Sequence, residues 1–105
     1  MTDQLDPLRR SDGIDQLRAT VDGGVVHLDG EIDLATSGWL RGVLAELQPG
    51  MPLTLDMASV SFMDSSGIRV LLSISGDRDL TLVNPSERVH AVLEMSGLLE
   101  RFHLA

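Results

Sequence analysis

The spacing of apolar residues predicts an opening β-hairpin. From Ile14 onward, apolar and polar side chains alternate, which is typical of a half-buried strand with Leu17, Ala19 and Val21 on its inward side. Asp22-Gly23 then supplies a tight turn, because glycine readily takes the positive φ that such a turn requires. The returning strand covers Val25 to Leu28. Residues 1–12 are polar and show no period, and we interpret them as a mobile lead-in.

A first helix follows this hairpin. Asp33 is suited to cap its first turn, because a short carboxylate accepts hydrogen bonds from unpaired backbone N–H groups. Apolar residues then recur at the helical intervals i, i+3, i+4 and i+7, at Leu40, Val43, Leu44 and Leu47. Pro49-Gly50 is a strong breaker pair that ends the helix. The next strand is expected from Pro52 to Met57.

A second helix is predicted after a short loop. The loop covers Ala58 to Met63, and the helix begins at Asp64 or Ser65. Its apolar residues again have helical spacing, so it should continue to about Ser75. Gly76-Asp77 is expected to break it.

The last third of the chain predicts one more strand and one more helix. The strand runs from Leu80 to Val83. Asn84 is expected to cap the helix, with Pro85 at its first position and Glu87 three residues after the cap. Ser96-Gly97 closes this helix, because glycine is favoured just beyond a helix end.

These elements define the fold class. Their order is β-β-α-β-α-β-α, and the tail adds a short final strand around Phe102 to Leu104. Strands separated by helices pair in parallel through right-handed crossovers, whereas the opening hairpin is antiparallel. We therefore predict a single α/β domain over residues 1–105, with a mixed sheet and helices packed on it.

The acidic composition of the chain limits the kinds of partner that it is expected to bind. The chain has 105 residues, 16 acidic side chains against 8 arginines, no lysine, and a net charge of −8. Such a surface repels phosphate backbones, so nucleic acid is a poor partner and a basic protein surface is a better one. No apolar run is long enough to cross a membrane, the start does not resemble a signal peptide, and cysteine is absent. These features favour the cytoplasm.

The sequence lacks a recognisable catalytic or metal-binding pattern. A serine nucleophile at Ser65 or Ser66 would need a histidine base, but His27, His90 and His103 are spread over three separate elements. Neither the histidine spacing of a metal site nor a glycine-rich phosphate loop occurs. We therefore expect no enzyme activity and no cofactor. The two serines at the predicted helix start can either cap the helix or accept a phosphate, and the local pattern leaves both roles open.

Three motifs resemble a known family. One stretch of the chain resembles the signature of the STAS domain family, specifically of its anti-sigma factor antagonists. This stretch is Ser61-Phe62-Met63-Asp64-Ser65-Ser66-Gly67-Ile68. Two further stretches resemble motifs of the same family in their residue types and in their order along the chain. They are Gly30-Glu31-Ile32-Asp33 and Met95-Ser96-Gly97-Leu98. The resemblance implies a regulator of transcription that, unphosphorylated, binds an anti-sigma serine kinase and frees a sigma factor. It also implies phosphorylation of Ser65 as the off-switch and a serine phosphatase that resets it.

The resemblance also implies which residues bind the partner: Asp33, Met63, Asp64, Ser66, Gly67, Ile68 and Arg69. Gly67 either allows close approach of the partner backbone or serves a tight turn. Arg69 lies four residues after Ser65, on the same helix face, and can reach phosphoserine, contact the partner, or remain solvated. Two alternatives stay open: a STAS subunit that binds constitutively within a transport or signalling assembly, and, less favoured, a small hydrolase.

Overall fold

A mixed sheet forms the centre of the protein, with six strands among the described residues. The computed structural model describes residues 9–11, 16–100 and 102–104. The strands are β1 (Arg9–Ser11), β2 (Leu17–Asp22), β3 (Val25–Ile32), β4 (Leu53–Met63), β5 (Leu80–Val83) and β6 (His103–Leu104). They lie in the sheet in chain order; β1, β2 and β3 pair antiparallel, and the pairs from β3 to β6 are parallel. The predicted α/β class with an antiparallel opening is confirmed.

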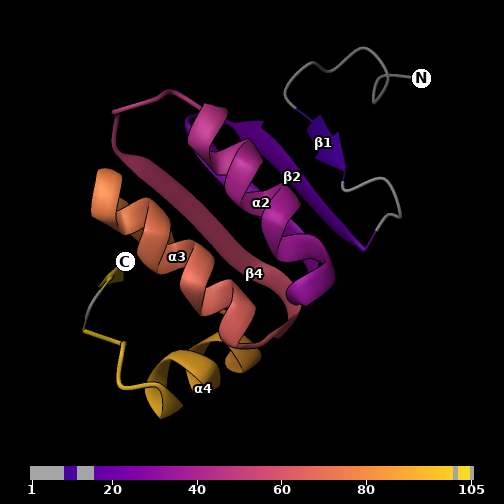
Figure 1. Ribbon diagram of the computed structural model, residues 1–105, viewed down its shortest axis with the longest axis vertical. Helices are drawn as coiled ribbons and strands as arrows, with labels where there is room; N and C mark the ends of the chain where they lie inside the picture. Colours follow the sequence, from indigo (N-terminus) through magenta and orange to yellow (C-terminus); the bar gives the residue numbers. More distant parts are fainter. Residues whose placement is uncertain (1–8, 12–15, 101, 105) are drawn as a thin grey trace.

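The described part of the chain includes three helices that pack on this sheet. They are α2 (Leu34–Glu46), α3 (Ser65–Asp77) and α4 (Glu87–Met95). Figure 1 shows α2 and α3 lying side by side across one face, with α4 near the lower end of the molecule, where it packs against β4. Both α2 and α3 begin at this lower end, so their first turns are neighbours.

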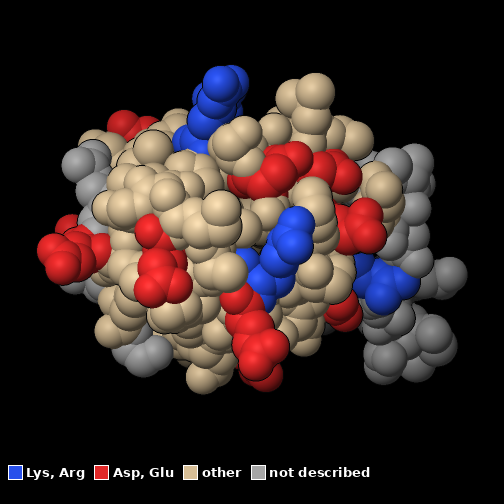
Figure 2. Space-filling model, turned by 90° about the horizontal axis from the view of Figure 1, so that it is seen from below, with Lys and Arg blue, Asp and Glu red and all other residues tan. Residues whose placement is uncertain are grey.

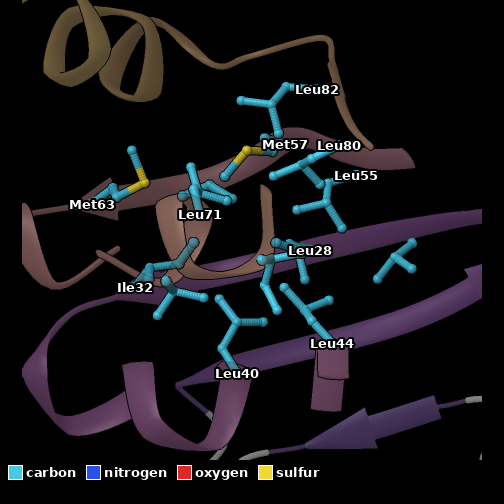
Figure 3. Packing of buried hydrophobic residues seen from close by; sticks show 14 of the residues in the cluster. Leu28, Ile32, Leu40, Leu44, Leu55, Met57, Met63, Leu71, Leu80 and Leu82 are labelled. Atoms are coloured by element: carbon cyan, nitrogen blue, oxygen red, sulfur yellow. The ribbon is translucent and has the colours of Figure 1, made fainter. Parts of the chain in front are cut away.

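The core lies between these two helices and the sheet. Leu40 and Leu44 of α2 and Leu71 of α3 are fully buried against Leu28 of β3 and Leu55 of β4 (Figure 3). Burial of one such leucine stabilises the fold by roughly 1.5–3 kcal/mol. The helical spacing that predicted these inward residues is thus confirmed, and it fixes how α2 and α3 rest on the sheet.

The predicted loop at Ala58 to Met63 is wrong, because β4 continues to Met63. Two register shifts against β3 each place an extra residue in β4, one before Ser59 and one before Phe62. Each such bulge reverses which residues face inward, so Val60 and Met63 are buried although they break the period of two. A pattern search for strict alternation ends at the first bulge.

The hairpin and the lead-in also differ from the prediction. The turn is Gly23-Gly24, with φ of 62° and 83°, and Asp22 still pairs with Val25. The lead-in prediction is wrong for Arg9–Ser11, which pair with β2 as β1; the other residues of that stretch lie outside the described residues. The returning strand extends past Leu28 because its pairing continues along β2 and β4.

Two helix ends are corrected as well. The second helix passes through Gly76 and ends at Asp77. Asn84 does not cap α4, since it adopts a positive φ of 52°. Ser86 is the cap instead: its Oγ accepts from the backbone N–H of Val89 at 3.2 Å. Ser86 also donates to the carbonyl of Val60 at 2.8 Å, a contact that joins this cap to β4.

Candidate functional site

The candidate site lies where two neighbouring strands turn into helices. Ile32 and Met63, the last residues of β3 and β4, are register partners. The backbone N–H of Asp64 donates to the carbonyl of Ile32 at 3.2 Å, which joins the two turns. The strand pairing therefore places Asp33 and Asp64, the residues that cap α2 and α3, next to each other. This is the lower end of Figure 1.

Asp33 is the N-cap of α2, as predicted. Its Oδ1 accepts from the backbone N–H groups of Ala35 and Thr36, at 2.9 and 3.1 Å. The hydroxyl of Thr36 accepts from the N–H of Asp33 at 3.0 Å and donates to the carbonyl of Glu31 at 2.9 Å. Thr36 is fully buried. Its part in capping α2 was not predicted from the sequence. The spacing Asp-x-x-Thr after a strand was the signal that could have revealed it.

Asp64 is the N-cap of α3, which separates the roles of the two serines. Its Oδ1 accepts from the backbone N–H of Ser66 at 2.8 Å. Ser65 is the first residue of the helix and is exposed. Within the described part of the chain its hydroxyl makes no hydrogen bond. Because Asp64 does the capping, the Ser65 hydroxyl is free to face an incoming group.

Three of the predicted partner-binding residues are buried. Met63 is fully buried, Ile68 is 7% exposed and Gly67 is buried. A Cβ added to Gly67 would lie 2.5 Å from Met63 Cγ and 2.9 Å from Ile32 Cγ2. In this conformation these three residues expose little surface, and their direct contact with a partner stays a prediction. Gly67 instead allows close approach of α3 to the strand ends of its own domain.

The remaining predicted residues gather on one surface. Asp33 and Asp64 are half-buried at the two helix starts, Ser65 and Arg69 are exposed, and Ser66 is half-buried. Figure 2 views this end of the molecule and shows acidic side chains over it, with a few arginines standing out between them. The surface therefore carries an exposed hydroxyl near the two carboxylates that cap α2 and α3.

A hollow of about 230 Å³ opens between α2 and α3 at Ser66, the residue after Ser65. It is lined by Leu34, Ser37, Gly38, Arg41, Ser66, Arg69 and Val70. Leu34 is 81% exposed, which is unusual for a leucine. Sequence reasoning missed Leu34 and Arg41, because their nearness to Ser66 and Arg69 depends on how the two helices pack. We refer to these seven residues as the α2–α3 hollow.

The histidines whose side chains are described do not bond to the serines. His27 Nδ1 lies 3.0 Å from Asp56 Oδ2, within the paired strands β3 and β4. His90 is exposed on α4. Between residues 16 and 100, neither serine hydroxyl is bonded to a histidine. The described residues include no cluster of three or more metal-ligating side chains, and none of their helices has the length and apolarity to span a membrane.

The fold and the site together define a class of protein: a single mixed α/β domain with an exposed serine at the helix start that follows a central strand. The chain belongs to the STAS domain family, whose model matches residues 14–105. The family predicted from the three motifs is confirmed. Two relatives are similar over 86 residues each. The anti-sigma F factor antagonist of Paenibacillus polymyxa is 34% identical, with 72% of each chain covered. The anti-sigma-B factor antagonist of Staphylococcus epidermidis is 29% identical, covering 75% of this chain and 80% of the relative.

Solved structures show the same fold. An anti-sigma factor antagonist from Mycobacterium paratuberculosis aligns with a TM-score of 0.71 at 23% identity, covering 84% of this chain and 82% of that one. The Bacillus cell fate determinant SpoIIAA in its phosphorylated form aligns with a TM-score of 0.55 at 25% identity, covering 85% and 90%. The likeness thus extends over most of each chain.

Proposed function

We propose that this protein is an anti-sigma factor antagonist controlled by phosphorylation of Ser65. The unphosphorylated form binds an anti-sigma factor that is a serine kinase, in the cytoplasm, and so frees a sigma factor for transcription. The kinase transfers the γ-phosphoryl group of ATP to Ser65 Oγ; the hydroxyl loses its proton and ADP leaves. A serine phosphatase then restores the binding form. The domain itself acts by binding and requires no cofactor.

One observation carries this proposal: Ser65 is exposed with an unbonded hydroxyl, while Asp64 beside it caps the helix. A serine that capped α3 would have its hydroxyl oxygen engaged with backbone N–H groups. Here the two tasks are divided between neighbouring residues. Ser65 can be modified without loss of the cap.

The charge of a phosphate explains how binding would end. It adds about −1.5 to −2 charges, and the helix macrodipole favours negative charge at the first turn. The fold therefore tolerates the modification. A partner surface that matches the bare hydroxyl, by contrast, would meet new bulk and charge next to Asp64 and Asp33. The switch acts on association rather than on folding.

The similar proteins support the proposed class of function. The two sequence relatives are both named as anti-sigma factor antagonists, and one solved relative was determined in a phosphorylated form. The net charge of −8 and the acidic side chains at this end of the molecule suit a partner with a basic surface (Figure 2).

The test measures binding of the candidate anti-sigma kinase to the wild type and to Ser65→Ala and Ser65→Glu. Alanine should retain binding, and glutamate should weaken it at least tenfold. Ser73→Glu is the matched control, because Ser73 is an exposed serine on the same helix, about two turns away. Intact-mass analysis after incubation with kinase and ATP should show one phosphate on the wild type and none on Ser65→Ala. Equal binding by all variants would support constitutive association and overturn the switch.

A further inference from the structure

Two arginines converge on the α2–α3 hollow without any partner of their own. Side chains are described for five arginines: Arg18, Arg41, Arg69, Arg78 and Arg88. Arg78 donates to the carbonyls of three residues, Leu44, Gln48 and Met51. Arg88 stacks over the ring of Phe62, with its guanidinium carbon 4.6 Å from the ring centroid. Arg18 also has a partner. Among these five, only Arg41 and Arg69 are left without one.

This placement is unusual for so acidic a chain. Acidic residues outnumber arginines 16 to 8, yet no Asp or Glu lines the hollow that holds Arg41 and Arg69. Solvated arginines on such a surface would be expected to find carboxylates nearby. The hollow offers two serines instead: the Ser66 hydroxyl can donate a hydrogen bond, whereas the Ser37 hydroxyl donates to the carbonyl of Leu34 at 3.4 Å. Two guanidinium groups with a nearby hydroxyl are a donor set that suits a phosphoryl group.

Two neighbours of Ser65 on α3 line this hollow. Ser66 follows Ser65 directly in the chain, and Arg69 follows Ser65 by four residues, so the side chains of Ser65 and Arg69 share one face of α3. Arg41 reaches the same space from α2. We propose that the α2–α3 hollow binds the phosphoryl group of phosphorylated Ser65, held by Arg69 and Arg41.

This inference rests on the proposed function and extends it to the regulated state. The exposed Ser65 hydroxyl bears the phosphoryl group, and the two arginines draw it over the hollow. Phosphorylation then does two things: it adds charge at the docking surface, and it occupies two arginines and covers the space beside Leu34. Both changes involve exposed side chains within about two turns of the starts of α2 and α3, so the rest of the fold stays as it is.

Other charged groups act on the same phosphate. The carboxylates of Asp33 and Asp64 stand at the starts of α2 and α3 and oppose a second negative charge, although both accept backbone N–H groups. Arg41 and Arg69 favour it. The second pKa of the phosphate therefore reports the balance between the carboxylates, which raise it, and the arginines, which lower it. Substitution of the arginines measures their contribution to this pKa.

The experiment installs phosphoserine at position 65 by chemical synthesis and ligation and follows its second ionisation by ³¹P NMR at low salt. A free phosphoserine titrates at about 6. Relative to the phosphorylated wild type, Arg69→Gln and Arg41→Gln should each raise the pKa by roughly 0.5 unit, and the double variant by more. Arg18→Gln is the control with the same charge change, because Arg18 lies on the sheet face opposite to the buried Leu17 and Ala19. It should leave the pKa unchanged. The Nε resonances of Arg41 and Arg69 should also shift as the phosphate ionises.

An unchanged pKa in the double variant would overturn the proposal. So would an equal rise in Arg18→Gln, which would indicate a general charge effect. The outcome is separable from that of the proposed function, because no kinase or partner enters the measurement. If the hollow failed to bind the phosphate, the binding test with Ser65→Ala and Ser65→Glu would stand unaffected.

Discussion

Substitution of Gly67 by alanine should move the helix start that presents Ser65. The added Cβ would lie 2.5 Å from Met63 Cγ and 2.9 Å from both Met63 Sδ and Ile32 Cγ2. Real carbon atoms do not approach so closely, and both neighbours are fully buried, so neither can move into solvent. Overpacking of this kind costs roughly 1–3 kcal/mol, against a gain of up to about 1 kcal/mol from replacing glycine in a helix. We expect a net loss of about 1–2 kcal/mol.

The assay is urea unfolding followed by circular dichroism. Gly42→Ala is the matched control, because Gly42 lies within α2 and a Cβ there meets nothing within 4 Å. That variant should gain stability by about 0.5–1 kcal/mol. Met63→Ala removes both of the close Met63 atoms, so the double variant Gly67→Ala/Met63→Ala should lose less than the sum of the two single changes. If Gly67→Ala were as stable as Gly42→Ala, the close packing of α3 on the strand ends would be refuted.

Three further changes test other parts of the structure by urea unfolding. Thr36→Val keeps the shape but removes a buried hydroxyl that bonds both ways, so it should cost about 1–3 kcal/mol; a neutral result would refute the buried cap. Gly30→Ala should be strongly destabilising, because φ is 127° and the new Cβ would lie 2.0 Å from the Gln16 carbonyl oxygen; near-wild-type stability would contradict this contact. The N–H of Ala58, with smaller help from His27 and Asn84, holds the pKa of Asp56 below its usual value. The ionised Asp56 carboxylate therefore stabilises the fold fully at pH values above the pKa of Asp56 in the unfolded chain, about 3.9. This stabilisation is lost as the pH falls through the lower pKa that Asp56 has in the folded protein. Asp56→Asn should reduce the loss of unfolding free energy at acid pH. If the pH profile of stability were unchanged in this variant, the stabilising role of Asp56 would be contradicted.

Local chemistry explains why much of the fold could be predicted from the sequence. The helical period located α2 and α3, since their inward leucines depend on neighbours within a few residues; the predicted breaker Gly76, by contrast, lies inside α3. Asp33 was recognised as a cap for the same reason. Asn84 was mistaken for a cap because Asn84 and Ser86 are both suitable, and only the contact of Ser86 with the Val60 carbonyl decides between them.

The rest depends on contacts between distant segments. The bulges in β4 follow from its pairing with β3, and no local pattern marks where the extra residues fall. The burial of Gly67 depends on Ile32, thirty-five residues earlier in the chain. The hollow combines Arg41 of α2 with Arg69 of α3. The sequence motif therefore located the site, whereas the division of labour within the site required the structure.

That division has a consequence for how the motif works. Met63, Gly67 and Ile68 are interior residues that set the height and direction of α3, and Asp64 holds its first turn. Ser65 alone combines exposure with an unbonded hydroxyl in this stretch of the motif. Changes to the interior residues alter stability and the position of the surface together, whereas a change at Ser65 alters the surface and leaves the packing intact. A regulatory charge placed at Ser65 can therefore act on a partner without unfolding the domain, because the residues that hold the helix in place are separate from the residue that is modified.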